Sequence, residues 1–199
     1  MKKIILAVAT VCMFGLAQAQ ETATISQGIK VGGNLANWKG DIAGNNPRIG
    51  FHIGGFIDIR TSEKLSIQPE LLFSSQGTKV EINFFGDHYK SRAVVNYLNV
   101  PVMFKYYAAE QFTIQAGPQV GFLLSAKEKW EGGGDSGEET ISGLNSIDFG
   151  INFGLGYNIN ENMFIEARYN IGLSNLVKDA EGDASVQNAV FQLSLGFRL

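Results

Sequence analysis

Hydrophobic and polar residues alternate along most of this chain, and the alternation is clearest over residues 146–173. From Ile147 to Ile159 every second residue is Ile, Phe, Leu or Tyr, and the residues between them are Asp, Gly or Asn. Three turn-forming residues follow at 160–162, and the alternation restarts at Met163. A period of two is typical of a β-strand with one apolar and one polar face. This stretch therefore predicts two strands joined by a tight turn.

The same pattern predicts eight strands along the chain. They cover residues 27–35, 48–60, 64–75, 93–107 and 111–125, the two strands within 146–173, and residues 188–199. The connections alternate between long segments, such as 126–145, and turns of about three residues, such as 61–63 and 108–110. Weak alternation over 78–82 indicates that the hairpin around 76–92 continues beyond the ends of the other strands.

An even number of strands with alternating connection lengths is typical of outer-membrane barrels, which have short periplasmic turns and longer extracellular loops. We therefore predict an all-β fold, an eight-stranded antiparallel up-and-down transmembrane β-barrel. This arrangement places both termini in the periplasm and the long loops outside the cell.

Charged residues indicate which face of each strand meets lipid. Within the predicted strands no Lys, Arg, Asp or Glu lies at a position of the apolar face. A charge that faces lipid at the bilayer midplane costs about 2–4 kcal/mol, so this distribution favours lipid on the apolar side. The polar faces hold nine charged residues, which we expect to form a paired ionic network in the lumen. They are Lys30, Asp58, Arg60, Glu70, Lys105, Asp148, Glu166, Arg168 and Arg198.

Aromatic residues lie near both ends of the predicted strands, on the apolar face. Girdles of aromatic residues mark the two interfaces of a membrane barrel, so we expect one at each end. The girdle near the short turns consists of Tyr106, Phe112, Tyr157 and Phe197, and the other consists of Phe51, Phe73, Phe122 and Phe149.

The N-terminus has the features of a secretory signal peptide. Lys2 and Lys3 precede an apolar stretch at 4–16, and an Ala-Gln-Ala cleavage site follows at 17–19. We therefore divide the chain into a signal peptide at 1–19, a short lead at 20–26 and a barrel at 27–199. Cys12, the one cysteine, falls in the signal peptide, so the mature chain lacks a thiol for a disulfide or a metal site.

Composition narrows the class of protein further. Charged residues make up 18% of the 199 residues, there are 24 Gly and 4 Pro, and no apolar run is long enough for a transmembrane helix. These features fit neither a disordered chain nor a basic nucleic-acid-binding protein.

Candidate catalytic and metal-binding groups are few. His52 shares the polar face of its strand with Asp58, but the sequence places no Ser or Cys nucleophile beside them, so we interpret His52 as a hydrogen-bonded lumen residue. His88 lies in a long polar segment. The alternating acids at 179–183 lack the full spacing of a calcium loop. We predict no catalytic residue, no cofactor and no bound metal.

Aromatic residues in the long connections are candidates for contact with a partner. They are Trp130 and the pair at 84–85. The alternative interpretation is that these side chains pack within the loops or against the membrane interface.

Four short motifs carry a family resemblance. They are GIKVGGN at 28–34, YLNVPV at 97–102, AGPQ at 116–119 and LGFRL at 195–199. With them the chain resembles the outer-membrane β-barrel family common in Bacteroidetes, often called porin-like or PorT-like. The resemblance implies a barrel with the architecture of the OmpA membrane domain and OmpX. It implies no single activity, although some relatives assist secretion systems.

The sequence favours a plugged scaffold that displays its loops, because the lumen of an eight-stranded barrel is only wide enough to be filled by side chains. We expect a monomer without enzymatic activity. Its expected partners are outer-membrane lipid and lipopolysaccharide, the barrel-assembly machinery during insertion, and a protein at the extracellular loops, but no nucleic acid. The alternatives are a narrow passive channel, an outer-membrane enzyme, or a soluble ligand-binding barrel of the lipocalin type.

Overall fold

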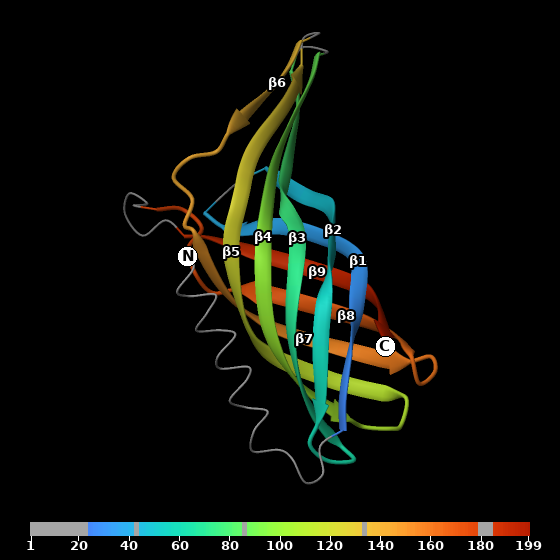
Figure 1. Cartoon of the computed structure of the whole chain (residues 1–199). Coiled ribbons are helices and arrows are strands. Elements are labelled where there is room, and N and C mark those ends of the chain that lie inside the picture. The colour runs from blue at the N-terminus through green and yellow to red at the C-terminus, as the bar shows by residue number, and fades with distance from the viewer. Residues whose placement is uncertain (1–23, 42–43, 85–86, 133–134, 179–184) are drawn as a thin grey trace.

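The computed structural model describes residues 24–41, 44–84, 87–132, 135–178 and 185–199. The predicted signal peptide and its cleavage site lie outside the described residues, as do the acids at 179–183. The described chain forms nine strands (Figure 1). Their bounds are β1 Thr24–Gly40, β2 Asn45–Arg60, β3 Leu65–Phe84, β4 Asp87–Tyr107, β5 Phe112–Gly132, β6 Asp135–Thr140, β7 Ile147–Asn158, β8 Met163–Gly172 and β9 Val186–Arg198. The described part of the chain has no helix long and apolar enough to cross a bilayer.

Eight of these strands close into an antiparallel ring. Going round the ring the order is β1, β2, β3, β4, β5, β7, β8 and β9, and β9 pairs with β1 to complete it. The predicted eight-stranded up-and-down barrel is thus confirmed. All predicted strands are present, and several are longer than the alternation indicated.

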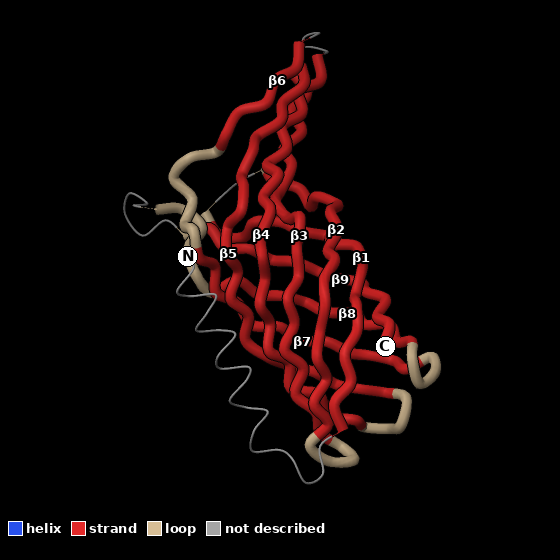
Figure 2. Tube along the Cα trace, viewed as in Figure 1, coloured by secondary structure: helices blue, strands red, loops and turns tan. Residues whose placement is uncertain are grey.

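The ninth strand belongs to a projection beyond the ring. β3, β4 and β5 have 20, 21 and 21 residues, whereas β7 and β8 have 12 and 10, so the first three extend past one end of the barrel. β6 pairs with the end of β5. We call this four-stranded sheet, residues 78–84, 87–94, 127–132 and 135–140, the fin (Figures 1 and 2).

The fin confirms one prediction and corrects another. The hairpin around 76–92 does continue, with pairing from Thr78 and Ala93 to Phe84 and Asp87. The prediction that 126–145 is only a loop was wrong, because this segment contains the end of β5 and all of β6. Charged residues occupy both faces of these strands, so the period of hydrophobicity gives no signal there.

The side chains have the inside-out arrangement of a membrane barrel. Ile29 and Leu193 face outward and are each 58% exposed, while their neighbours Lys30 and Gln192 are 1% and 3% exposed inside the barrel. This orientation excludes a soluble barrel with an apolar interior, because the apolar face of each strand is the exposed one.

One irregularity explains a polar residue on the outer face. Asn96 of β4 pairs with Ser125, whereas Tyr97 pairs with Leu123, so Leu124 is an extra residue in β5. Such a bulge lets the strand change direction where the fin leaves the barrel. Asn96 donates a hydrogen bond to Ser125 Oγ across the pair at 2.9 Å.

The short turns and both ends of the described barrel lie at the end opposite the fin. Thr24 at the start of β1 pairs with Arg60, which precedes a short turn, and Gly28 pairs with Arg198 at the end of β9. The other short turns join β4 to β5 and β7 to β8. The barrel thus has a short-turn end and a fin end.

Candidate functional site

Two glutamates form the centre of the lumen. Lys30 Nζ joins them, at 2.8 Å from Glu70 Oε1 and 2.6 Å from Glu166 Oε2. Arg168 donates two hydrogen bonds to Glu70, at 3.0 and 2.8 Å, and Lys105 Nζ lies 2.8 Å from Glu166 Oε1. Each of these five side chains is at most 2% exposed. We call them the lumen network.

The lumen network spans the full diameter of the barrel. Glu70 is in β3 and Arg168 is in β8, and four steps separate these strands in either direction round the ring. The bidentate pair therefore connects opposite walls. A fork-to-fork arginine–carboxylate pair fixes geometry as well as contributing energy.

Neutral and acidic neighbours add further polar contacts to the lumen network. Gln68 Nε2 donates to Glu70 at 2.7 Å, Gln68 Oε1 accepts from Lys105 at 2.6 Å, and Gln115 Oε1 accepts from Arg168 at 3.3 Å. Asp58 lies 3.9 Å from Lys105. With Asp58 the three cations are matched by three carboxylates, as the burial of several charges requires.

Two aromatic rings lie beside the lumen network, and sequence reasoning missed both. Phe56 and Phe164 meet edge to face with ring centroids 5.4 Å apart, and Lys105 Nζ lies 4.9 Å from the centroid of Phe164. The register sets each ring beside a glycine, and a Cβ at Gly28 or Gly196 would lie 2.5 or 2.1 Å from a ring atom. The alternation itself was the available signal, because each Phe lies an even number of residues from the inward-facing charged residues of its own strand.

His52 occupies the next layer of the lumen. Its Nδ1 lies 2.7 Å from Asn34 Oδ1 and its Nε2 lies 2.9 Å from Ser194 Oγ. The predicted hydrogen-bonded lumen histidine is confirmed, with these partners rather than Asp58. The hydrogen-bonded series Ser194, His52 and Asn34 resembles a hydrolase triad. Here Ser194 and His52 are 6% and 0% exposed, so the hydroxyl faces packed lumen side chains.

Three predicted members of the ionic network lie outside the lumen network. Asp148 accepts hydrogen bonds from Ser174 at 2.7 Å and Asn188 at 2.8 Å, nearer the fin end. Arg60 is exposed at the short-turn end, with its guanidinium 4.1 Å from the centroid of Tyr107. Arg198 donates to Asn158 Oδ1 at 2.8 Å. The prediction of one network of nine was wrong here, because strand phase indicates the direction of a side chain but not its height.

Arg60 and Arg198 line an open cavity of about 480 Å³ at the short-turn end. Its walls also include Tyr107, Asp58 and Glu161. Asp58 lies at the inner side of this cavity, next to Lys105, so the cavity ends where the lumen network begins.

An apolar cluster closes the other end of the lumen. Its buried members are Val95, Tyr97, Ala126, Leu144 and Leu176, and Trp38, Leu123, Ile141 and Val186 pack against it. We call this cluster the cap. Leu144 and Leu176 come from the β6–β7 and β8–β9 connections, which are joined by a bridge between Leu144 and Val177 and by a hydrogen bond from Asn145 N to Leu176 O at 2.7 Å.

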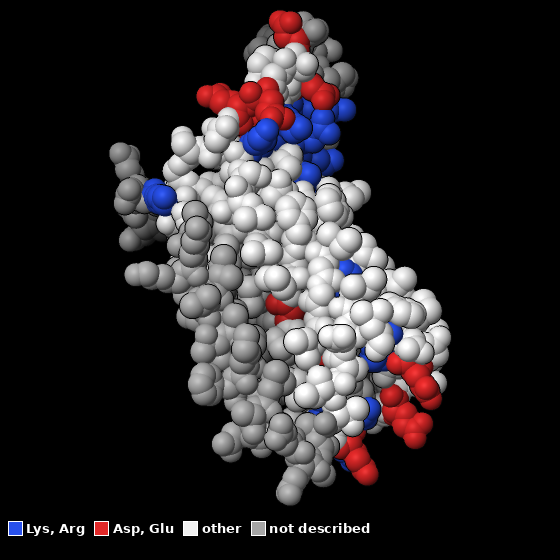
Figure 3. Space-filling view, in the orientation of Figure 1, with Lys and Arg blue, Asp and Glu red and all other residues white. Residues whose placement is uncertain are grey.

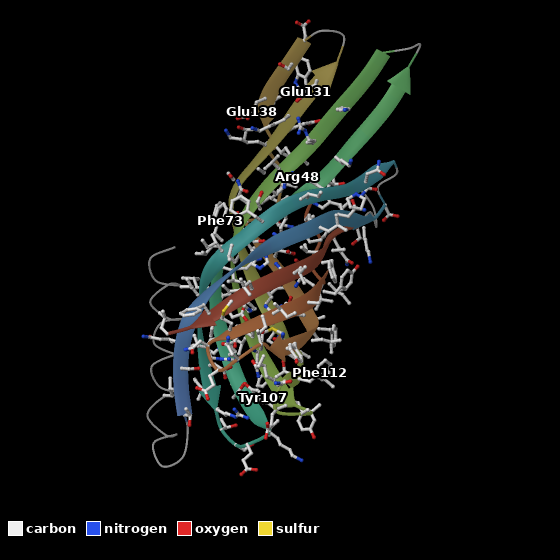
Figure 4. The ribbon with its side chains drawn as sticks, turned by 90° about the vertical axis from the view of Figure 1, so that its right-hand side faces the viewer. Arg48, Phe73, Tyr107, Phe112, Glu131 and Glu138 are labelled. Atoms are coloured by element: carbon white, nitrogen blue, oxygen red, sulfur yellow. The ribbon has the colours of Figure 1, made fainter. Side chains whose placement is uncertain are left out.

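The eight predicted girdle residues all lie on the outer face and none is buried. Phe51 and Phe73 are in contact near the fin end, with ring centroids 5.7 Å apart, and Phe112 pairs with Tyr157 near the short-turn end. Figure 4 shows Phe73 close to the base of the fin and Phe112 at the opposite end.

Among the described residues the exposed ion pairs lie in the fin, where Figure 3 shows acidic and basic side chains gathered together. Arg92 lies 2.5 Å from Glu131, and Lys129 lies 2.8 Å from Glu138, which also pairs with Lys127. Hydrogen bonds from these two lysines lower the pKa of Glu138 to about 2. Figure 4 shows Glu131 and Glu138 well away from the barrel body.

On the other face of the fin, Trp130 is 44% exposed and lies over Gly137. The aromatic pair predicted at 84–85 has no described side chains, and neither does His88. Across the parts of the chain that the structure describes, no group of three or more His, Cys, Asp or Glu is arranged to hold a metal ion.

Comparison with known proteins shows similarity to outer-membrane barrels. Ail, the attachment invasion locus protein of Yersinia pestis, is 16% identical over 87% of this chain and 98% of that one, with a TM-score of 0.47. Neisserial surface protein A is 13% identical over 90% and 99%, with a TM-score of 0.43. The N-terminal barrel domain of Pseudomonas aeruginosa OprF is 12% identical over 89% and 100%, with a TM-score of 0.38.

A search of curated proteins found no match. The profile of the outer membrane protein beta-barrel domain matches residues 16–178, which is most of the chain. The chain therefore belongs to the outer-membrane β-barrel domain family.

Proposed function

We propose that this protein is a monomeric, non-conducting and non-enzymatic scaffold of the outer membrane that presents the fin as an interaction surface. The observation that supports this most directly is the lumen network. Its bidentate pair between Arg168 and Glu70 connects opposite walls, and its five side chains fill the central cross-section.

Both the lumen network and the cap oppose ion flow. A permeating ion would have to displace charge pairs in a low-dielectric interior, where separating them is costly. It would then meet the apolar cap, in which Leu144 and Leu176 are 9% and 2% exposed. An eight-stranded ring offers little space around such a plug.

Conductance in planar lipid bilayers tests this proposal. The protein purified from outer membranes is expected to insert without producing stable current steps, while a porin added to the same bilayer gives them. Large, stable conductance from the protein alone would overturn the scaffold and support the passive channel.

The proposed orientation places the fin outside the cell and both termini in the periplasm, with the aromatic girdles at the two interfaces. It is supported by the three short turns at one end of the barrel and the long connections at the other. In this setting the barrel-assembly machinery inserts the chain, and the outer face contacts lipid and lipopolysaccharide.

Single cysteines test the orientation, because the predicted mature chain has none. Ser136→Cys lies in the fin and Glu63→Cys in a short turn, and both native residues are exposed. A membrane-impermeant maleimide applied to intact cells is expected to label the first variant alone, and both after lysis. Labelling of Glu63→Cys in intact cells would reverse the orientation.

We further propose that residues 1–19 are removed on export. N-terminal sequencing of the protein from outer membranes is expected to begin at Gln20, and retention of Met1 would contradict this.

A further inference from the structure

One face of the fin continues the lipid-facing surface of the barrel. In β4 the outward positions include Leu98, Val94, Arg92 and Lys90. Val94 pairs with Lys127 of β5. Phe73, a predicted girdle residue, pairs with Leu98. Val94, opposite Lys127, lies four residues further along, roughly 13 Å at a strand rise of 3.3 Å per residue, and Arg92 and Lys90 lie roughly 20 and 26 Å along; the heights are less once the strand is tilted. Positive side chains thus begin a short distance above the apolar belt.

Basic residues dominate this face. They are Lys79, Lys90, Arg92, Lys127 and Lys129, and with Arg48 of β2, which lies close to Arg92, we call them the basic band. Two acids with described side chains share the face, namely Glu131 and Glu138. Figure 3 shows the basic side chains gathered between the largely uncharged body and the end of the fin.

Contacts of Arg48 and of the two lysines at Glu138 indicate that their positive charge is not fully compensated. Arg48 Nη1 donates to Gln76 O at 2.9 Å and lies 3.3 Å from Ser75 Oγ, both neutral acceptors. Arg48 and Arg92 are close enough for their charges to repel. Glu138 is shared between two lysines. Lys79, Lys90, Ser91, Arg92 and Glu131 line a shallow hollow of about 210 Å³.

The opposite face of the fin has the reverse character. Its described side chains include Glu128, Trp130 and Glu139 and no Lys or Arg. Binding of a soluble polyanion would not require the positive charge to lie on the one face that continues the lipid-facing surface of the barrel. An anionic layer at the surface of the bilayer would meet that face alone.

We propose that the basic band binds the phosphate groups of the glycolipid in the outer leaflet, with the sugar–phosphate headgroup against Arg92 and Lys90. This rests on the proposed orientation with the fin outside the cell. The apolar belt below contacts the acyl chains of the same lipid. The opposite face, with Trp130, stays available to a partner.

Binding of purified lipid A to the full protein in detergent, measured by native mass spectrometry, tests the proposal. Diphosphoryl lipid A is expected to bind at least about 10-fold more tightly than the same lipid with both phosphates removed. In the Lys90→Gln/Arg92→Gln variant the affinity for diphosphoryl lipid A is expected to fall about 10- to 30-fold, from roughly 1 kcal/mol for each cation at an anionic surface. The matched control is Arg60→Gln/Lys64→Gln, which removes two exposed cations at the short-turn end and is expected to bind as the unmodified protein does.

Several results would overturn the proposal that the basic band binds lipid phosphate. Equal affinity for phosphorylated and dephosphorylated lipid, or an unchanged affinity in the Lys90/Arg92 variant, would overturn the proposal. Equally strong competition by inorganic phosphate at matched charge, or by a soluble polysulfate, would assign the basic band to a soluble anion and also overturn it. Heat-modifiable migration in gels establishes that each variant is folded. The outcome of this experiment is independent of the maleimide experiment, because lipid A binding in detergent does not depend on the orientation in cells.

Discussion

The lumen and the fin contain the same kind of ion pair in opposite surroundings. Glu166 lies 2.6 Å from Lys30 with both side chains 1% exposed, and Glu138 lies 2.8 Å from Lys129 with side chains 39% and 48% exposed. In water such a pair contributes little, because screening and side-chain entropy offset the attraction. In the lumen the loss of one partner leaves an uncompensated buried charge. Burial, rather than distance, therefore separates a structural element from a surface available for binding.

The largest expected effect comes from Glu70→Ala. It leaves Arg168 without its bidentate partner and Lys30 with one carboxylate, so the free energy of unfolding should fall by about 3–5 kcal/mol. Urea unfolding in lipid vesicles, followed by Trp fluorescence, measures this. Glu138→Ala is the matched control in the fin and is expected to leave the transition midpoint almost unchanged. Similar losses in the two variants would remove the distinction between the regions.

Leu176→Ala is expected to have the next largest effect. Leu176 is 2% exposed in the cap, and truncating such a buried Leu lowers the free energy of unfolding by about 2–4 kcal/mol. The neighbouring Val177→Ala changes a residue that is 37% exposed and is expected to have a much smaller effect. The same unfolding experiment compares them, and equal losses would show that the cap is not a packed core.

Gly196→Ala tests how tightly the lumen is packed. The added Cβ would lie 2.1 Å from the Phe164 ring, so the ring must move away from the lumen network, with an expected loss of about 1–3 kcal/mol. Gly33→Ala is the control, because a Cβ there meets no atom within 4 Å. Unfolding midpoints that are equal for the two variants would contradict the packing of Phe164 over Gly196.

The smallest effect is the titration of Glu138 in the fin. Its pKa of about 2 in the folded protein lies below the ordinary glutamate value of 4.5, so the stabilisation from its lysines is complete above the ordinary pKa and is lost as the pH falls through about 2. Carboxyl-carbon NMR titration measures the pKa directly. In Lys127→Gln/Lys129→Gln the pKa should return toward its ordinary value, and an ordinary pKa in the unmodified protein would contradict the pairing.

The sequence allowed the barrel to be predicted where the membrane imposes alternation. Ile29 faces outward and Lys30 inward because lipid and a narrow lumen demand different side chains. In the fin both faces are polar, so β6 left no hydrophobic period to detect. The alternation along each strand also could not distinguish Arg168 at the centre of the lumen from Arg198 at the short-turn end. The position of a residue along the barrel axis depends on the register between strands. Phe164 is not predicted from the sequence, because a large apolar residue fits on the inner face only where its pairing with Gly196 makes room for it.

A double-mutant cycle between Glu70 and Arg168 tests the central claim most directly, namely that buried charge pairs hold opposite walls of the barrel together. The cycle uses Glu70→Ala, Arg168→Ala and the double variant, and is compared with the same cycle for Glu131 and Arg92 in the fin. The account predicts a coupling free energy of about 2–3 kcal/mol in the lumen and less than about 1 kcal/mol in the fin. Equal coupling in the two cycles, or none across the lumen, would contradict it.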